Sequence, residues 1–246
     1  MAAVPMTSLP DRRTRVRFRR RLLAWYGRHR RDLPWRRTED PYHILVAEIM
    51  LQQTQVDRVV PKYHEFLDRY PTLEALAASA PDDVKRLWYP LGYNVRPLNL
   101  HGIACEAVAT YGGRLPDDDE ALRAMRGIGR YTAGAVRCFA YGRPVPIVDT
   151  NVRRVLGRVF LGPRRLARLR GQKAMWDLAG ALVPPRKAYD YNQALMDFGA
   201  TWCTPRSPRC GLCPMWRTSA ASGRDHSEAR PAPRGADGRV DGRARG

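Results

Sequence analysis

The sequence predicts an all-α protein, on three observations. Apolar residues recur at helical spacing along most of the chain, no run alternates apolar and polar residues with a period of two, and prolines interrupt the pattern at intervals. An apolar content of 44% supports a sizeable core, and 246 residues are enough for one large domain or two small ones.

The N-terminal part of the chain consists of a short segment without periodicity and an arginine-rich helix. Residues 1–13 lack periodicity, and we expect them to be disordered. An arginine-rich helix follows within residues 14–40, and Pro34 ends it. Its apolar face consists of Phe18, Leu22, Trp25 and Tyr26. The basic face is either simply solvated or in contact with phosphate groups.

The charge distribution narrows the class of partner. The formal net charge is +19, and residues 11–37 contribute more than half of it, with twelve arginines against two acids. A basic surface of this size favours a polyanion, either nucleic acid or an anionic membrane. No apolar run reaches membrane-spanning length and no signal peptide is visible. Nucleic acid is therefore the expected partner and the cytoplasm the expected compartment.

One carboxylate lies in an otherwise apolar helical pattern. Residues 41–56 are apolar nearly all round, which predicts a helix buried on most sides, and Glu48 interrupts the run. Burial without a strong partner raises the pKa of a carboxyl, as a general acid near neutral pH requires. The alternative is a glutamate paired with an arginine at a helix edge.

Prolines at positions 61, 71, 81 and 116 interrupt the next helical patterns, which lie at residues 59–67, 73–77, 84–88 and 98–111. Asp117 and Asp118 then open a short helix with acids in its first turn. Gly127 and Gly129 provide the backbone freedom for a sharp reversal into a further helix. The N–H groups at the start of that helix suit a phosphate oxygen.

The C-terminal third begins with Asp149, which a loop delivers after the hairpin. Helical patterns follow at residues 152–159, 175–182 and 189–199. Three of the five cysteines then cluster near the end, which in a cytosolic protein suggests metal binding rather than disulfides. Residues 217–246 contain almost nothing apolar, so we expect a disordered basic tail.

The glycine turn and the loop after it carry a resemblance. Gly127-Ile128-Gly129 followed by Tyr131, with Asp149 twenty residues after Gly129, resembles the helix-hairpin-helix and Gly/Pro-Asp signature of DNA glycosylases. Within that superfamily the chain is most similar, from about residue 33 to residue 214, to adenine glycosylases of the MutY type, relatives of endonuclease III.

The resemblance implies a fold and an activity. Residues 41–148 would form a six-helix barrel-like domain with the hairpin at about 118–141. Residues 14–40 and 149–216 would build the other half, with a DNA-binding cleft between the two. The implied enzyme is a monomeric, monofunctional base-excision-repair glycosylase that acts on double-stranded DNA. It would hydrolyse the N-glycosidic bond of adenine mispaired with guanine or 8-oxoguanine.

The resemblance also implies catalytic roles. Glu48 would protonate the adenine ring and position water, and Asp149 would stabilise the sugar cation, with Asn151 orienting water near it. Tyr131 stands where bifunctional relatives have a nucleophilic lysine. The simpler readings are a helix cap for Asp149, a packed aromatic for Tyr131 and a first-turn polar residue for Asn151.

Further residues match positions that contact DNA. Gln53 and Tyr93 would wedge into the base stack and lie near the opposite base, although alone they would be read as a surface residue and a core aromatic. The other implied DNA contacts are Arg36, Gly127, Gly129, Arg130 and Thr132.

The cysteine loop has the spacing Cys203-x6-Cys210-x2-Cys213. The resemblance implies a [4Fe–4S] cluster, but Ser219 occupies the fourth ligand position. A zinc site and a loop without metal are the alternatives.

Three departures leave rival functions open. Arg126 replaces the usual proline before the hairpin glycines, residues 90–94 read PLGYN where the family has GLGYY, and no 8-oxoguanine-recognition domain follows the cysteine loop. A thymine or uracil glycosylase acting on G mismatches is one alternative. A non-catalytic helix-hairpin-helix DNA-binding protein is the other.

Overall fold

The computed structural model describes residues 9–92, 95–162 and 172–216. Every regular element in these residues is a helix, as the sequence predicts. None of the described helices is long and apolar enough to cross a membrane. The elements are α1 (Arg12–His29), η1 (Pro34–Arg36), α2 (Pro41–Met50), α3 (Val56–Arg69), α4 (Leu73–Ala77), α5 (Pro81–Trp88), η2 (Tyr89–Leu91), α6 (Val95–Tyr111), α7 (Asp119–Ala124), α8 (Arg130–Phe139), α9 (Thr150–Leu156), a π-helical turn η3 (Gly157–Leu161), α11 (Lys173–Leu182), α12 (Ala188–Thr201) and η4 (Cys210–Leu212).

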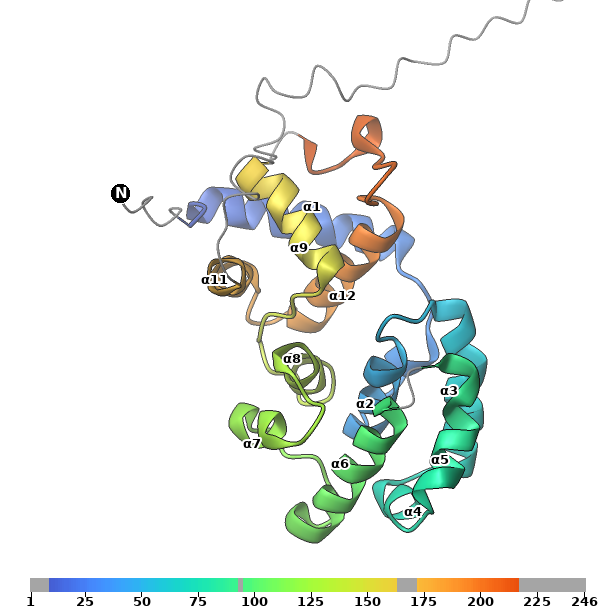
Figure 1. Ribbon diagram of the computed structural model, residues 1–246. Coiled ribbons are helices and arrows are strands. Elements are labelled where there is room, and N and C mark those ends of the chain that lie inside the picture. The colour runs from blue at the N-terminus through green and yellow to red at the C-terminus, as the bar shows by residue number, and fades with distance from the viewer. Residues whose placement is uncertain (1–8, 93–94, 163–171, 217–246) are drawn as a thin grey trace, which may run out of the picture.

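The helices form two groups, which Figure 1 shows one above the other. In the lower group α6 packs against α4 and α5, and α2 packs against α8. In the upper group α12 packs against both α1 and α9, so that the N-terminal helix joins elements from the C-terminal third. This arrangement places α2 and α8 on one side of the space that α9 and α12 face from the other side.

Helix α1 begins earlier than the sequence pattern indicates. Asp11 caps it by accepting from the backbone N–H of Thr14 at 2.8 Å, so Arg12 and Arg13 are helical and the expected disordered segment 1–13 is too long. Residues 1–8 lie outside the described residues. The expected apolar face of α1 is buried. Arg19, beside that face, donates to the carbonyls of three residues at the end of α11, namely Ala181, Leu182 and Val183.

Prolines have two different effects on the helices. Pro41 and Pro81 occupy the first positions of α2 and α5, where a proline has no N–H to lose and its φ suits the helix. Pro61 was expected to interrupt the helical pattern, but it lies inside α3, which contains all of the predicted helix 59–67. It removes only one backbone hydrogen bond near the start of the helix, and the strong amphipathic face of α3 compensates by packing Val59 and Phe66 in the core.

The predicted hairpin forms between α7 and α8. Asp118 caps α7 by accepting from the backbone N–H of Ala121 at 2.8 Å. Gly127 has φ of 97°, a region that L residues avoid, and an added Cβ would lie 2.9 Å from the side chain of Asn99 on α6. The turn therefore needs glycine both for its backbone and for its approach to α6.

Candidate active site

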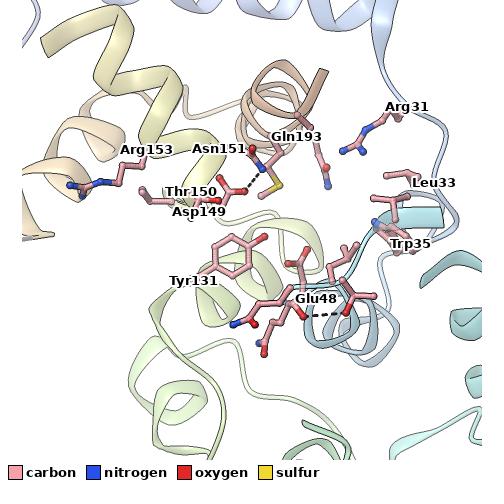
Figure 2. Close-up of a pocket in the computed structure, with 18 of the residues that line it drawn as sticks. Arg31, Leu33, Trp35, Glu48, Tyr131, Asp149, Thr150, Asn151, Arg153 and Gln193 are labelled. Carbon is pink, nitrogen blue, oxygen red and sulfur yellow. Dashed lines mark hydrogen bonds between the residues drawn. The ribbon is translucent and has the colours of Figure 1, made fainter. Parts of the chain in front are cut away.

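One pocket brings together the four residues predicted to be catalytic. It has a volume of about 640 Å³ and is lined from both helix groups. Glu48 comes from α2, Tyr131 from α8, and Asp149 and Asn151 from the start of α9. Figure 2 shows Tyr131 lying between Glu48 and Asp149. Residues that are far apart in the sequence thus share a single cavity.

Glu48 is held as a buried, largely unpaired carboxyl. Glu48 is 5% exposed, and its Oε2 has no hydrogen-bond partner. Burial raises the pKa of Glu48 to about 7, and the charge of Asp149 adds to this, while Tyr131 and, least of all, Arg36 lower it. No salt bridge to Glu48 is found in the described part of the chain, so the helix-edge ion pair considered from sequence does not form. Near neutral pH this carboxyl can hold and release a proton.

Asp149 both caps a helix and faces the pocket. Its Oδ1 accepts from the backbone N–H of Val152 at 2.6 Å, which makes it the N-cap of α9. Its Oδ2 accepts from the side-chain amide of Asn151 at 2.9 Å. Arg154 in turn donates to the Asn151 side-chain oxygen Oδ1 at 2.6 Å, which fixes the orientation of that amide. The two alternatives weighed for Asp149 are therefore compatible.

Tyr131 is a partly buried phenol directed at the two acids. Burial, together with the negative charges of Glu48 and Asp149, raises the pKa of Tyr131 well above its ordinary value. The hydroxyl therefore stays neutral beside Glu48. Among the described residues no lysine lines the pocket, which leaves no amine there to attack a sugar.

Gln53 lies at the edge of the pocket in an unusual backbone conformation. It has φ of 57°, and it is the single non-glycine residue with positive φ in the described part of the chain. Its loop lies between α2, which ends at Met50, and α3. The sequence-based helix was drawn through residue 56, so it continued too far. Tyr93, the other proposed wedge, lies outside the described residues.

The hairpin residues have different environments. Gly129 is the N-cap of α8 and provides no side-chain cap, which leaves the first N–H groups of α8 free for an anion. The Arg130 guanidinium lies over the Trp176 ring at 4.1 Å, and its residue remains exposed. Thr132 as a whole is buried, so its side chain has no exposed surface to offer DNA.

Arg36 is engaged inside the protein. Its guanidinium donates twice to Asp197, each time at 2.8 Å, and Arg31 donates to the same carboxylate at 2.7 Å. The Arg36 side chain is 8% exposed and that of Asp197 is fully buried. Burial would raise the pKa of Asp197, but the two arginines hold it below its usual value. The sequence led us to expect that Arg36 contacts DNA, but little of its guanidinium is exposed to make such a contact.

Two buried polar residues of α12 at the site were not anticipated. Gln193 is 4% exposed, and its amide projects into the pocket from the side opposite Glu48 (Figure 2). Asp197 holds the two arginines one turn further along the helix. The available signal was the polar side chain at each of these positions within an otherwise buried stretch of helix.

The cysteine loop lies next to α9 and α12. Arg158 is 3.4 Å from the Cys203 sulfur and donates to the Thr204 carbonyl at 2.8 Å. Three thiols on one loop suit a soft centre such as an iron–sulfur cluster. In the described part of the chain, however, no group of three Cys, His, Asp or Glu side chains is close enough together to hold a metal ion. The fourth expected position, Ser219, lies outside the described residues.

Comparison with known protein families gives two matches. The model of the HhH-GPD superfamily of base excision DNA repair proteins matches residues 46–178. The model of the iron–sulfur binding domain of endonuclease III matches residues 203–217. The first match contains Glu48, Tyr131 and Asp149, and the second begins at the first cysteine of the loop.

Individual relatives extend these matches. An adenine DNA glycosylase from Mycolicibacterium smegmatis is 47% identical over 80% of this chain and 69% of its own length. A thymine/uracil-DNA glycosylase from Pyrobaculum aerophilum is 38% identical over 81% of this chain and 89% of its own length. A solved structure of a thermostable thymine-DNA glycosylase has a TM-score of 0.80 at 36% identity, covering 85% of this chain and 96% of that one.

Proposed function

The chain belongs to the HhH-GPD superfamily of base excision DNA repair proteins, and from this premise we propose that it is a monofunctional glycosylase that releases adenine from mispaired DNA. The observation that carries the proposal is the pocket in which a carboxyl with a pKa of about 7, Glu48, faces Tyr131 and Asp149. These groups meet the two chemical needs of N-glycosidic hydrolysis, a proton for the leaving base and a negative charge near the sugar.

Glu48 would supply the proton. An adenine is a poor leaving group until a ring nitrogen is protonated, and a general acid works best when its pKa lies near the working pH. The buried α2 position provides this pKa through desolvation. Tyr131, which stays neutral, would hold the carboxyl in place and would donate a hydrogen bond after the proton has left.

Asp149 would stabilise the positive charge that develops on the sugar. Its two oxygens already accept from Val152 and Asn151, so the carboxylate is oriented before DNA arrives. The lack of a pocket lysine among the described residues supports hydrolysis without strand cleavage. Water would add to the sugar carbon as the protonated base leaves, so the products would be free base and an abasic site.

Access to the bond would require the nucleotide to leave the helix stack. Gln53 is an exposed residue of the pocket lining, and it would fill the space that the base vacates, together with Tyr93. The free N–H groups at the start of α8, with the exposed Arg130, would hold a phosphate without reading sequence.

Adenine is favoured over pyrimidines by the higher identity to the mycobacterial adenine glycosylase. Thymine or uracil opposite guanine remains the second candidate, because the pyrimidine glycosylases match the chain over most of their own length. Single-turnover base release should be measured on duplexes with A opposite G, A opposite 8-oxoguanine, T opposite G and U opposite G. Faster release of T or U than of A would reverse the assignment.

The cysteine loop matches an iron–sulfur binding domain. We propose that Cys203, Cys210 and Cys213 hold a [4Fe–4S] cluster, with Ser219 or water at the fourth iron. The cluster would supply a rigid centre for the loop. The cysteine loop is anchored by two arginine side chains, since Arg154 and Arg158 donate to the Cys203 backbone carbonyl at 2.8 and 3.4 Å.

A further inference from the structure

Arg96 is a buried arginine outside the pocket that joins two separate loops. It lies in the first turn of α6 and is 6% exposed. One guanidinium nitrogen, Nη1, donates to three carbonyls at the end of α2 and just after it, those of Ile49 at 3.0 Å, Met50 at 3.1 Å and Gln52 at 2.6 Å. Helix carbonyls at a C-terminus lack intrahelical partners, and a cation satisfies them well.

The second nitrogen reaches a different segment. Nη2 of Arg96 donates to the carbonyls of Leu91 at 3.2 Å and Gly92 at 3.1 Å, in the turn that leads into residues 93–94. Both nitrogens also approach the Thr54 hydroxyl oxygen, at 3.4 and 3.3 Å. A single planar cation therefore fixes the spacing between the loop after α2 and the turn after α5.

The loop after α2 is the one that contains the strained residue. Gln53 has positive φ, and such a conformation persists only when its surroundings hold it. The groups on either side of Gln53 are the Gln52 carbonyl and the Thr54 hydroxyl, and Arg96 contacts both. Arg96 thus holds the strained backbone from both sides while leaving the Gln53 side chain at the pocket.

We propose that Arg96 is a positioning residue that locks the Gln53 loop and the turn ending at Gly92 into one rigid wedge for opening the DNA stack. The proposal rests on the proposed function. A wedge that is ordered in advance does not lose loop entropy when it enters DNA, so base extrusion becomes more favourable. Lysine cannot replace arginine here, because its ammonium lacks the planar fork that serves the two loops at once.

The test compares R96K with the wild-type chain in two readouts. The duplex carries 2-aminopurine beside a target adenine opposite G, so its fluorescence reports unstacking, and single-turnover release of adenine is followed on the same duplex. We expect R96K to lose at least about tenfold in both, as loss of hydrogen bonds to a charged group predicts. Binding to an undamaged duplex should change by less than about twofold, since phosphate contacts are untouched.

A matched control separates positioning from general loss of stability. Arg19 also donates to three carbonyls at a helix end, that of α11, but it lies away from both loops. R19K should lower the melting temperature in the same way and leave the unstacking signal near wild type. T54V removes one acceptor of Arg96 with little change in shape, and it should weaken unstacking in the same direction as R96K.

Two outcomes would overturn the proposal. R96K could unstack the duplex as well as wild type does, whether or not it still releases base, or R19K could lose unstacking to the same extent as R96K. Failure of the proposed function looks different, because then the wild-type chain itself releases no base from any duplex.

Discussion

At the scale of single residues, Glu48 has opposite effects on stability and on function. A carboxyl buried on α2 with an unpaired oxygen destabilises the fold, and the same burial gives it a pKa of about 7. Positions of this kind are typical of active sites, where a local structural cost is retained for chemistry. The loss of folding stability caused by burying Glu48 depends on pH, so it can be measured.

Glu48→Gln should stabilise the fold, and only above acidic pH. Below the ordinary value of 4.5 the carboxyl is protonated in both the folded and the unfolded chain, so its titration adds no difference. As the pH rises toward 7, only the unfolded chain ionises, and the fold loses stability by up to about 3 kcal/mol. Urea unfolding of both proteins across this range should therefore show a gap that widens with pH. A constant gap would contradict the raised pKa.

The substitution Asp149→Asn tests whether the charge of Asp149 is needed for base release, because it preserves the residue's role as the N-cap of α9. Asparagine caps a helix about as well as aspartate, so α9 should remain stable. Loss of the negative charge should slow base release by on the order of a hundredfold or more, while binding to an abasic-site duplex is retained. Asp118→Asn is the matched control, because Asp118 caps α7 outside the pocket. Equal base release by both variants would remove Asp149 from the mechanism.

At the scale of elements, the hairpin shows what a local sequence can specify. Gly127 requires glycine for its φ of 97° and for its contact with Asn99, whereas Gly129 has φ of −90° and open space around it. Gly127→Ala should therefore lower stability by about 1–2 kcal/mol, and Gly129→Ala should change it much less. Thermal unfolding of the two variants checks this difference. Equal melting temperatures would mean that the turn tolerates a side chain at both positions.

The cysteine loop makes a prediction about composition. Purified protein should contain iron and the visible absorbance of an iron–sulfur cluster, and Cys210→Ser should lose both. Cys105→Ser is the control, since Cys105 lies on α6, outside the loop. Zinc in place of iron would support the rival site, and no metal in protein purified without oxygen would contradict the proposed cluster.

The sequence predicted most helices because their apolar faces repeat at the helical period. It missed features that depend on neighbours in space. Helix α3 continues through Pro61 because packing compensates for one missing hydrogen bond, and α2 ends at Met50, where Arg96 from α6 binds its last carbonyls. Neither effect has a signal in the local sequence. The boundaries of the two predicted halves, at residues 41–148 and 149–216, stay a prediction.

At the scale of the whole molecule, the two helix groups are joined beside the pocket by one buried carboxylate. Asp197 on α12 binds Arg31 and Arg36, which belong to the segment between α1 and α2. The pair of arginines compensates for the burial of Asp197, and its lowered pKa means that this stabilisation is lost only as the pH falls below the usual range of an aspartate. The connection keeps α2 and α12, and hence Glu48 and Gln193, at a fixed separation across the cavity.

The candidate site was predictable only in part, because some of its residues belong to sequence motifs and others do not. Motif residues such as Glu48 and Asp149 were identified without coordinates, because their chemistry and spacing resemble a known family. Gln193 and Asp197 were not, because their importance comes from what faces them across the pocket and not from a pattern along the helix. Arg36 was assigned to DNA from its sequence position, whereas the fold surrounds it with Asp197.

The most direct test of the account is the pH dependence of single-turnover adenine release from a duplex with A opposite G. The wild-type rate should fall as the pH rises through about 7, where Glu48 loses its proton, and Glu48→Gln should release almost no base while still binding the duplex. A rate that does not change from mildly acidic to mildly alkaline pH, or a Glu48→Gln variant that releases base at the wild-type rate, would contradict the assignment of this pocket as the site of base excision.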